Sequence, residues 1–252
     1  VSANTFRHLI DFSAAIRERV EASGGQVRYT AYGYHGSAVL IDGNYRWQTY
    51  TNYTQGYAKM RLEGIAQEAW AAGIKATVYN CPEIRTNSSD VFTGIELPLI
   101  PLLLALKKEN GGIWADEQWQ ACAQLLDDGL TMDDVFQKIH AMQESEVMRP
   151  FYDFSAWPMP NSQAQADLTI GTSNEITRMH RDSKVMMSDL LSALVVKSTG
   201  QLIFGESSDP SGPVLWLNHD IVARRLNASH ACPASFEPVT AGGSDASHLE
   251  VA

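Results

Sequence analysis

The sequence predicts a protein of α/β or α+β class, with a mixed sheet that contains a Tyr-rich antiparallel hairpin and several packed helices. Helical and strand-like periodicities alternate along the chain. A strand, a helix, a glycine and a second strand follow one another between residues 26 and 80, an order compatible with a βαβ crossover. Of the 252 residues, 44% are hydrophobic and 19% charged, as expected of a chain that folds around a core.

The first element is an amphipathic helix over Thr5–Ala22, because apolar residues recur at helical spacing and two glycines follow. Its predicted apolar positions are Phe6, Leu9, Ile10, Phe12, Ala15, Ile16 and Val20. Tyr and β-branched residues dominate the next segment, residues 26–53, where Asp42 and Gly43 form a hairpin turn signal. We expect two or three antiparallel strands there.

A second helix over Gln55–Ala72, ended by Gly73, and a strand over Ile74–Asn80 complete the possible crossover. The predicted core positions of this helix are Met60, Leu62, Ile65, Ala66, Ala69 and Trp70. Residues 81–98 contain many turn-forming residues and no periodicity, so we expect a long loop. Loops that follow strands often carry functional residues.

The middle of the chain predicts three helices. A buried helix covers Leu99–Lys108, and a helix pair follows over Ala115–Leu126 and Met132–Met142, with Thr131 as N-cap of the second. Pro, Ser, Asn and Gln then gather in residues 148–166. We interpret the chain as an α/β domain (1–147), this linker-like segment (148–166) and a smaller α+β region (167–252), which could also form one domain with the first.

The last region predicts a helix over Asn174–Ala193 and a hairpin over 195–206 that turns at Thr199 and Gly200. A strand over 213–218, a helix over His219–Leu226 and a polar tail from residue 228 onward complete the expected elements.

Charge and composition narrow the function classes. The formal net charge of −10 disfavours binding to nucleic-acid phosphates or to anionic lipid. The three cysteines are widely spaced, so neither a disulfide framework nor a zinc ribbon is predicted. We expect a soluble cytoplasmic protein without a membrane span, because no signal peptide is visible and the longest apolar stretch, Leu97–Leu106, is short and contains prolines. The common nucleotide and hydrolase motifs do not occur in the sequence, so we expect no cofactor.

Aromatic clustering is the most distinctive feature of the sequence. Eight of the nine tyrosines lie between residues 29 and 79. Clustered aromatic residues suit a recognition surface, although strands also favour them for packing alone. The candidate binding residues are Tyr32, Tyr34, Tyr45, Trp47, Tyr50 and Tyr53. Residues 32–37, Tyr-Gly-Tyr-His-Gly-Ser, resemble the aromatic-His-Gly-Ser/Thr run of ADP-ribosyltransferases, but the match covers a handful of residues without a placed catalytic glutamate, and no activity is inferred from it.

These features favour a noncatalytic subunit or interaction protein of a larger assembly, with phage or mobile-element origin as one option. It would bind protein partners, or itself, through the aromatic surface.

The first alternative is an enzyme, a hydrolase or transferase of unknown reaction, with a pocket between the Tyr-rich sheet and the loop after Cys81. Its candidate acid, base and nucleophile residues are Tyr34, His35, Cys81 and Glu83. The second alternative is a helix-turn-helix DNA-binding protein built on the helix pair. The four aspartates of that pair, at positions 127, 128, 133 and 134, have the wrong charge for DNA.

The best local set of metal-ligand types is His219, Asp220, His230 and Cys232. Zinc accepts these side chains, but their spacing matches no known site, so no metal is predicted.

Overall fold

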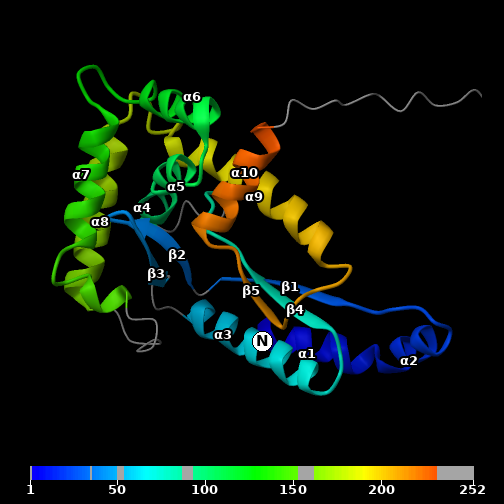
Figure 1. Cartoon of the computed structure of the whole chain (residues 1–252). Helices are drawn as coiled ribbons and strands as arrows, with labels where there is room; N and C mark the ends of the chain where they lie inside the picture. The colour runs from blue at the N-terminus through cyan, green and yellow to red at the C-terminus, as the bar shows by residue number, and fades with distance from the viewer. Residues whose placement is uncertain (1, 35, 50–53, 87–92, 153–161, 232–252) are drawn as a thin grey trace, which may run out of the picture.

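A computed structural model describes residues 2–34, 36–49, 54–86, 93–152 and 162–231, and it confirms the mixed α/β class. The described strands form two sheets (Figure 1). One is parallel, in the order β1-β4-β5, with β1 at Tyr29–Gly33, β4 at Ala76–Asn80 and β5 at Val214–Trp216. The other is the hairpin of β2 (Gly36–Ile41) and β3 (Asn44–Thr49). In these ranges no helix combines the length and apolar character needed to cross a bilayer.

The predicted βαβ crossover is confirmed. Strands β1 and β4 pair in parallel, with Tyr29 opposite Ala76 and Gly33 opposite Asn80, so both strands end at one edge of the sheet. Helix α3 (Thr54–Ala71) connects them after the hairpin, and Gly73, two residues beyond its end, has a left-handed φ of 81°. Apolar residues of α3 and of α1 (Ser2–Phe12) form one core with the sheet.

The turn at Asp42 and Gly43 is confirmed, because both residues have the positive φ, 46° and 69°, of a type I′ hairpin turn. The expectation that all strands of this segment are antiparallel is wrong for β1, which pairs with β4. An enrichment in Tyr and β-branched residues shows that a segment is extended but does not determine its partner strand.

The first predicted helix is divided in two. Helix α1 ends at Phe12, and α2 covers Ala14–Ala22. At the break the Ser13 hydroxyl donates to the Leu9 carbonyl oxygen at 2.6 Å. Helix α2 buries none of its residues, and Leu9, Phe12 and Ile16 are 53%, 83% and 62% exposed. The predicted apolar stripe therefore covers the sheet only through its first residues.

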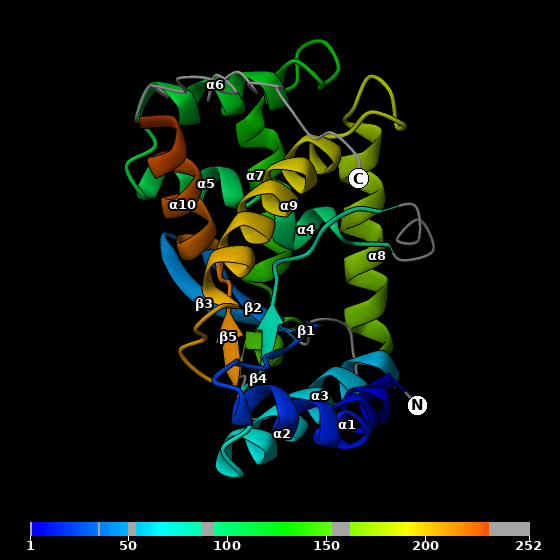
Figure 2. The ribbon, with the colours of Figure 1, turned by 90° about the vertical axis from the view of Figure 1, so that its right-hand side faces the viewer.

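Figure 2 shows α1 and α3 on one face of the parallel sheet and α9 (Met187–Glu206) on the other. The largest hydrophobic core lies beyond the sheet, between the first half of α9 and the remaining helices. These are α4 (Glu96–Leu99), α5 (Leu102–Lys108), α6 (Gly112–Ala123), α7 (Met132–Gln143), α8 (Gln163–Arg178) and α10 (His219–Ala231), with a 3-10 turn at Arg149–Tyr152. The predicted N-cap is confirmed, since Thr131 forms a capping box with Asp134.

The hairpin predicted over 195–206 is wrong, because this segment is the second half of α9. The Thr199 hydroxyl, expected in a turn, donates to the Val195 carbonyl oxygen at 2.7 Å within the helix. A short β-branched run around a glycine has the same local pattern in a strand and in a buried helix, and packing decides between them. The helix predicted over 174–193 is in fact two helices, with a break between Arg178 and Met187.

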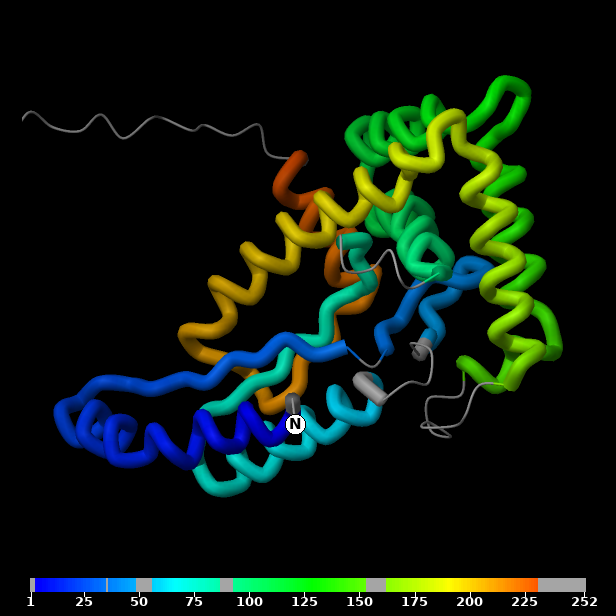
Figure 3. The backbone as a smooth tube through the Cα atoms, turned by 180° about the vertical axis from the view of Figure 1, so that it is seen from behind, coloured from blue at the N-terminus to red at the C-terminus, as the bar shows by residue number. Residues whose placement is uncertain are grey.

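Helices α7 and α8 run side by side, as the view from behind shows (Figure 3). The Lys138 ammonium and the Glu175 carboxylate form an ion pair at 2.8 Å across them. Strand β5, from the region after residue 166, pairs with β4 from the region before residue 148. The division at 148–166 stays a prediction.

Gly33 is the residue on which the edge of the parallel sheet depends, so Gly33→Ala is expected to destabilise the fold. A Cβ at this position would lie 2.1 Å from Asn80 Oδ1 and 2.6 Å from Val78 Cγ1. Overpacking of this kind costs about 1–3 kcal/mol, measurable by urea denaturation.

Gly64→Ala is the matched control, because nothing lies within 4 Å of the added carbon inside α3. It should leave the free energy of unfolding unchanged or raise it by up to about 1 kcal/mol. Equal stability of the two variants would contradict the close approach of β1 and β4.

Candidate active site

A cavity of about 440 Å³ opens at the edge where β1 and β4 end, beneath α9. In parallel α/β sheets ligands bind outside the carboxyl ends of the strands, so its position is the one expected of a functional site. The end of β1, helix α3, the loop after β4 and the second half of α9 line it. The lining residues are Tyr32, Gly33, Tyr34, Lys59, Cys81, Pro82, Glu83, Ile84, Val195, Val196, Thr199, Gly200 and Ile203.

Glu83 is the most perturbed acid of this cavity. Burial raises the pKa of its carboxyl to about 8, and a hydrogen bond with Tyr34 only partly opposes the shift. The Oε2 atom is buried and has no hydrogen-bond partner among the described residues. The carboxyl is therefore largely protonated at neutral pH and can donate a proton.

Lys59 and Cys81 are two further titratable residues of the cavity lining. The Lys59 ammonium donates to the Tyr32 carbonyl oxygen at 3.1 Å, and burial lowers its pKa. Burial also raises the pKa of the Cys81 thiol to about 11, although the nearby Lys59 acts in the opposite direction. At neutral pH the thiol is protonated, which does not favour Cys81 as a nucleophile.

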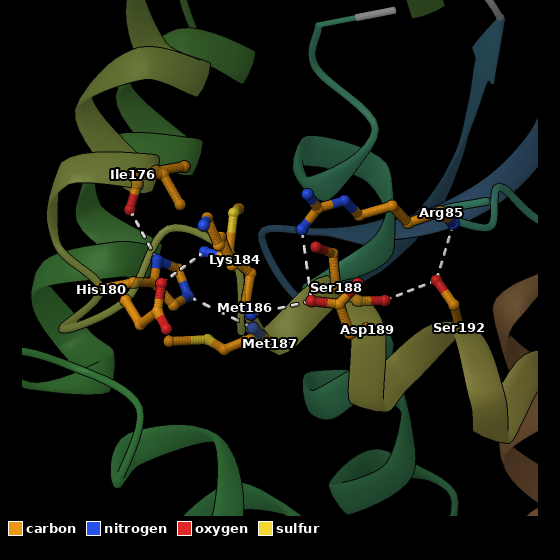
Figure 4. Close-up of polar contacts among 10 residues, drawn as sticks. Arg85, Ile176, His180, Lys184, Met186, Met187, Ser188, Asp189 and Ser192 are labelled. Carbon is orange, nitrogen blue, oxygen red and sulfur yellow. Dashed lines mark hydrogen bonds and ion pairs between the residues drawn. The ribbon is translucent and has the colours of Figure 1, made fainter. Parts of the chain in front are cut away.

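A polar clasp holds the loop that carries Glu83 against α9 (Figure 4). The Arg85 backbone N–H donates to the Ser192 hydroxyl at 2.7 Å, and the Arg85 guanidinium pairs with Asp189 at 3.2 Å. Asp189 also accepts from the Met186 N–H at 2.8 Å, which caps the start of α9. The clasp thus fixes both walls of the cavity relative to each other.

A buried histidine supports the same helix start. His180 accepts a hydrogen bond from the Met187 N–H at 3.3 Å through Nε2, while Nδ1 donates to the Ile176 carbonyl oxygen at 2.8 Å (Figure 4). Burial lowers the pKa of His180, which keeps the ring neutral in this role. Its function in the fold is structural.

The structure brings together three of the four predicted catalytic candidates, Tyr34, Cys81 and Glu83, in one cavity. The fourth, His35, lies outside the described residues. Sequence reasoning missed Lys59 and the α9 wall. The α9 wall was missed because its segment was interpreted as a hairpin.

The described residues of the predicted aromatic surface lie in different surroundings. Tyr32 is 63% exposed and lines the cavity, whereas Tyr45 donates to the Glu109 carboxylate at 2.9 Å. Trp47 packs edge-on against Trp216, with ring centroids 4.9 Å apart. Tyr50 and Tyr53 lie outside the described residues.

The metal-ligand candidates are also dispersed. His219 is buried, and burial lowers its pKa to about 3, whereas His230 stacks on Trp114 at 4.2 Å. They stand at opposite ends of α10, about 16 Å apart along the helix axis. Asp220 pairs with Arg224 at 2.6 Å, and Cys232 lies outside the described residues. Within the described ranges no group of three metal-ligand side chains forms.

Fold and cavity together define an α/β protein with a small-molecule pocket at the carboxyl edge of a parallel sheet. Residues 1–226 match the family model of the enoyl-acyl carrier protein reductase FabMG, and the chain belongs to this family.

Among the solved structures that are similar to the chain are two of FabMG. The apo structure of FabMG, described as a novel type of enoyl-acyl carrier protein reductase, is 63% identical with a TM-score of 0.88, over 92% of this chain and 53% of that one. The NADH-bound structure of FabMG is 57% identical with a TM-score of 0.75, over 90% of this chain and 54% of that one. The chain therefore spans about half the length of these solved chains. No curated protein matched it.

Membership of an enzyme family overturns the leading hypothesis of a noncatalytic structural subunit. It also overturns the helix-turn-helix hypothesis and, for the enzyme alternative, the expected hydrolase or transferase class. The noncatalytic hypothesis was wrong because clustered aromatic residues indicate a binding surface but do not show whether the bound molecule also reacts there.

Glu83 gives the folded protein a pH dependence that can be measured. The carboxyl titrates near pH 8 when folded and near its ordinary 4.5 when unfolded, so only the unfolded state releases the proton between these values. The free energy of unfolding should fall as pH rises through this window, by about 1.4 kcal/mol per pH unit.

Glu83→Gln should abolish this fall. Measured by urea denaturation, the free energy of unfolding of the variant relative to that of the wild type should therefore be higher at pH 8 than at pH 5. Glu18→Gln, at an exposed position of α2, should follow the wild type at both pH values. A wild-type stability that is flat across the window contradicts a neutral Glu83.

Proposed function

We propose that the chain forms part of an enoyl-acyl carrier protein reductase whose reaction takes place in the cavity at the end of β1 and β4. The observation that carries this proposal is a buried carboxyl, Glu83, held protonated at neutral pH in a cavity that also presents a phenol and an ammonium group. Membership of the FabMG family supplies the reaction class.

Reduction of an enoyl thioester needs a hydride at the β-carbon and a proton at the α-carbon. NADH, which one solved relative binds, supplies the hydride when bound. The electron pair of the double bond moves toward the thioester carbonyl, and protonation of the α-carbon completes a saturated thioester. Glu83 is the proton donor in this proposal, because its raised pKa keeps the proton available at neutral pH.

Tyr34 and Lys59 suit the charge that develops on the thioester oxygen. A phenol hydroxyl or an ammonium placed in a partly dry cavity stabilises an enolate oxygen more strongly than water does. The apolar wall from α9, which includes Val195 and Ile203, excludes water from the same space.

The described lining fits only part of a dinucleotide. Its apolar wall suits a flat, uncharged nicotinamide ring, but Lys59 is the single cation among the described lining residues, and a pyrophosphate needs several donors or cations. We therefore assign the nicotinamide end to this cavity and leave the pyrophosphate to other parts of the enzyme. The expectations of protein partners and of a cytoplasmic location remain proposals, with an acyl carrier protein as the partner that the family name implies.

Glu83→Gln is expected to lower kcat for a short enoyl thioester about 100-fold, because general acid catalysis contributes at least that factor. Wild-type activity should fall as pH rises through about 8, when Glu83 loses its proton, and the variant should lose this alkaline limb. Both are measured by NADH oxidation with crotonyl thioester as substrate.

The matched control is Glu96→Gln. Glu96 is a buried carboxyl whose pKa is also raised by burial, but it bonds Ser173 and does not line the cavity. The control should keep wild-type kcat and pH profile. A Glu83→Gln variant with nearly wild-type kcat and an intact alkaline limb would rule out Glu83 as the proton donor.

A further inference from the structure

A second hollow lies next to the cavity, between α1, α3 and the end of β1. It has a volume of about 500 Å³. Its apolar lining consists of Ala3, Phe6, Leu9, Ala31, Ala58 and Leu62, and Thr5 adds one hydroxyl. We call it the α1–α3 groove.

The groove and the cavity share two lining residues, Tyr32 and Lys59. These residues are joined by the hydrogen bond from the Lys59 ammonium to the Tyr32 carbonyl oxygen. Tyr32 and Lys59 therefore lie where the two hollows adjoin. A linear ligand with its polar, reactive end in the cavity can extend its apolar end past these two residues into the groove.

The groove has the chemistry of a hydrocarbon site. Phe6 and Leu62, each 7% exposed, belong to the core beneath it, whereas Leu9 is 53% exposed at its mouth. A ligand with amide or phosphate groups would need donors and acceptors, which this lining supplies poorly. A methylene chain needs none, and each buried methylene contributes about 0.8 kcal/mol, or about fourfold in affinity.

We propose that the α1–α3 groove binds the distal acyl chain of the substrate, with the thioester and the reacting double bond in the adjoining cavity and the chain beyond the β-carbon passing Tyr32 and Lys59 into the groove. The inference rests on the proposed function for the identity of the thioester. It adds the place where the acyl chain binds and a consequence for specificity. Substrates with longer acyl chains bind more tightly because these chains enter the groove.

The test compares the binding of two saturated thioesters, butyryl-CoA and dodecanoyl-CoA, to the chain by isothermal titration calorimetry. The wild type should bind dodecanoyl-CoA at least tenfold more tightly than butyryl-CoA. Leu9→Asp places a charge at the groove mouth and should reduce this preference to less than threefold. Leu9 is half exposed, so the substitution is compatible with folding.

Phe12→Asp is the matched control, because Phe12 is an apolar residue of the same helix, 83% exposed, and does not line the groove. It should keep the wild-type preference. Ala58→Trp, which fills the groove from α3, is the second variant and should also abolish the preference. Gln67→Trp, at an exposed position of α3 outside the groove, is its control.

Two results would overturn the inference: a wild type without chain-length preference, or a preference that Leu9→Asp and Ala58→Trp leave intact. The inference would also be overturned if Phe12→Asp lost the chain-length preference as fully as Leu9→Asp, because the effect would then not be local to the groove. A failure of the proposed function would give a different result. The whole enzyme would then not reduce a crotonyl thioester, although the preference for binding the longer acyl chain would persist.

Discussion

The close parallel pairing of β1 with β4 is the constraint on which the rest of the structure depends. Gly33 lies opposite Asn80, and only a residue without a side chain fits between the two strands at that point. The pairing brings the residues after both strands to one edge. Tyr34 and the loop from Cys81 to Glu83, almost fifty residues apart in sequence, thereby line the same cavity.

The second layer of the site comes from α9. Its start is held by Asp189 and His180, and its side chains reach back to the loop after β4 through Arg85 and Ser192. Because α9 closes over the strand ends, the Glu83 carboxyl is removed from water and retains its proton. The acid chemistry of the cavity is thus a property of packing, since an exposed glutamate would be ionised at neutral pH.

The proposed reaction and the proposed acyl groove use two adjoining hollows. The cavity offers proton donors, whereas the α1–α3 groove offers apolar side chains, and Tyr32 and Lys59 stand between them. This division suits a substrate with one reactive end and one inert end. It also gives a role to Tyr32, which sequence analysis placed in a protein-binding surface.

The sequence by itself determined the fold class, the hairpin turn, the crossover through α3 and the cap at Thr131, because periodicity, glycine positions and capping residues act locally. It also pointed to Tyr34, Cys81 and Glu83, since residues that follow strands meet at a sheet edge. Only the tertiary structure decided that residues 195–206 are helical, that Lys59 joins the site, that His219 and His230 are separate, and that Glu83 stays neutral. Those outcomes depend on burial against segments distant in the chain, which local patterns do not contain.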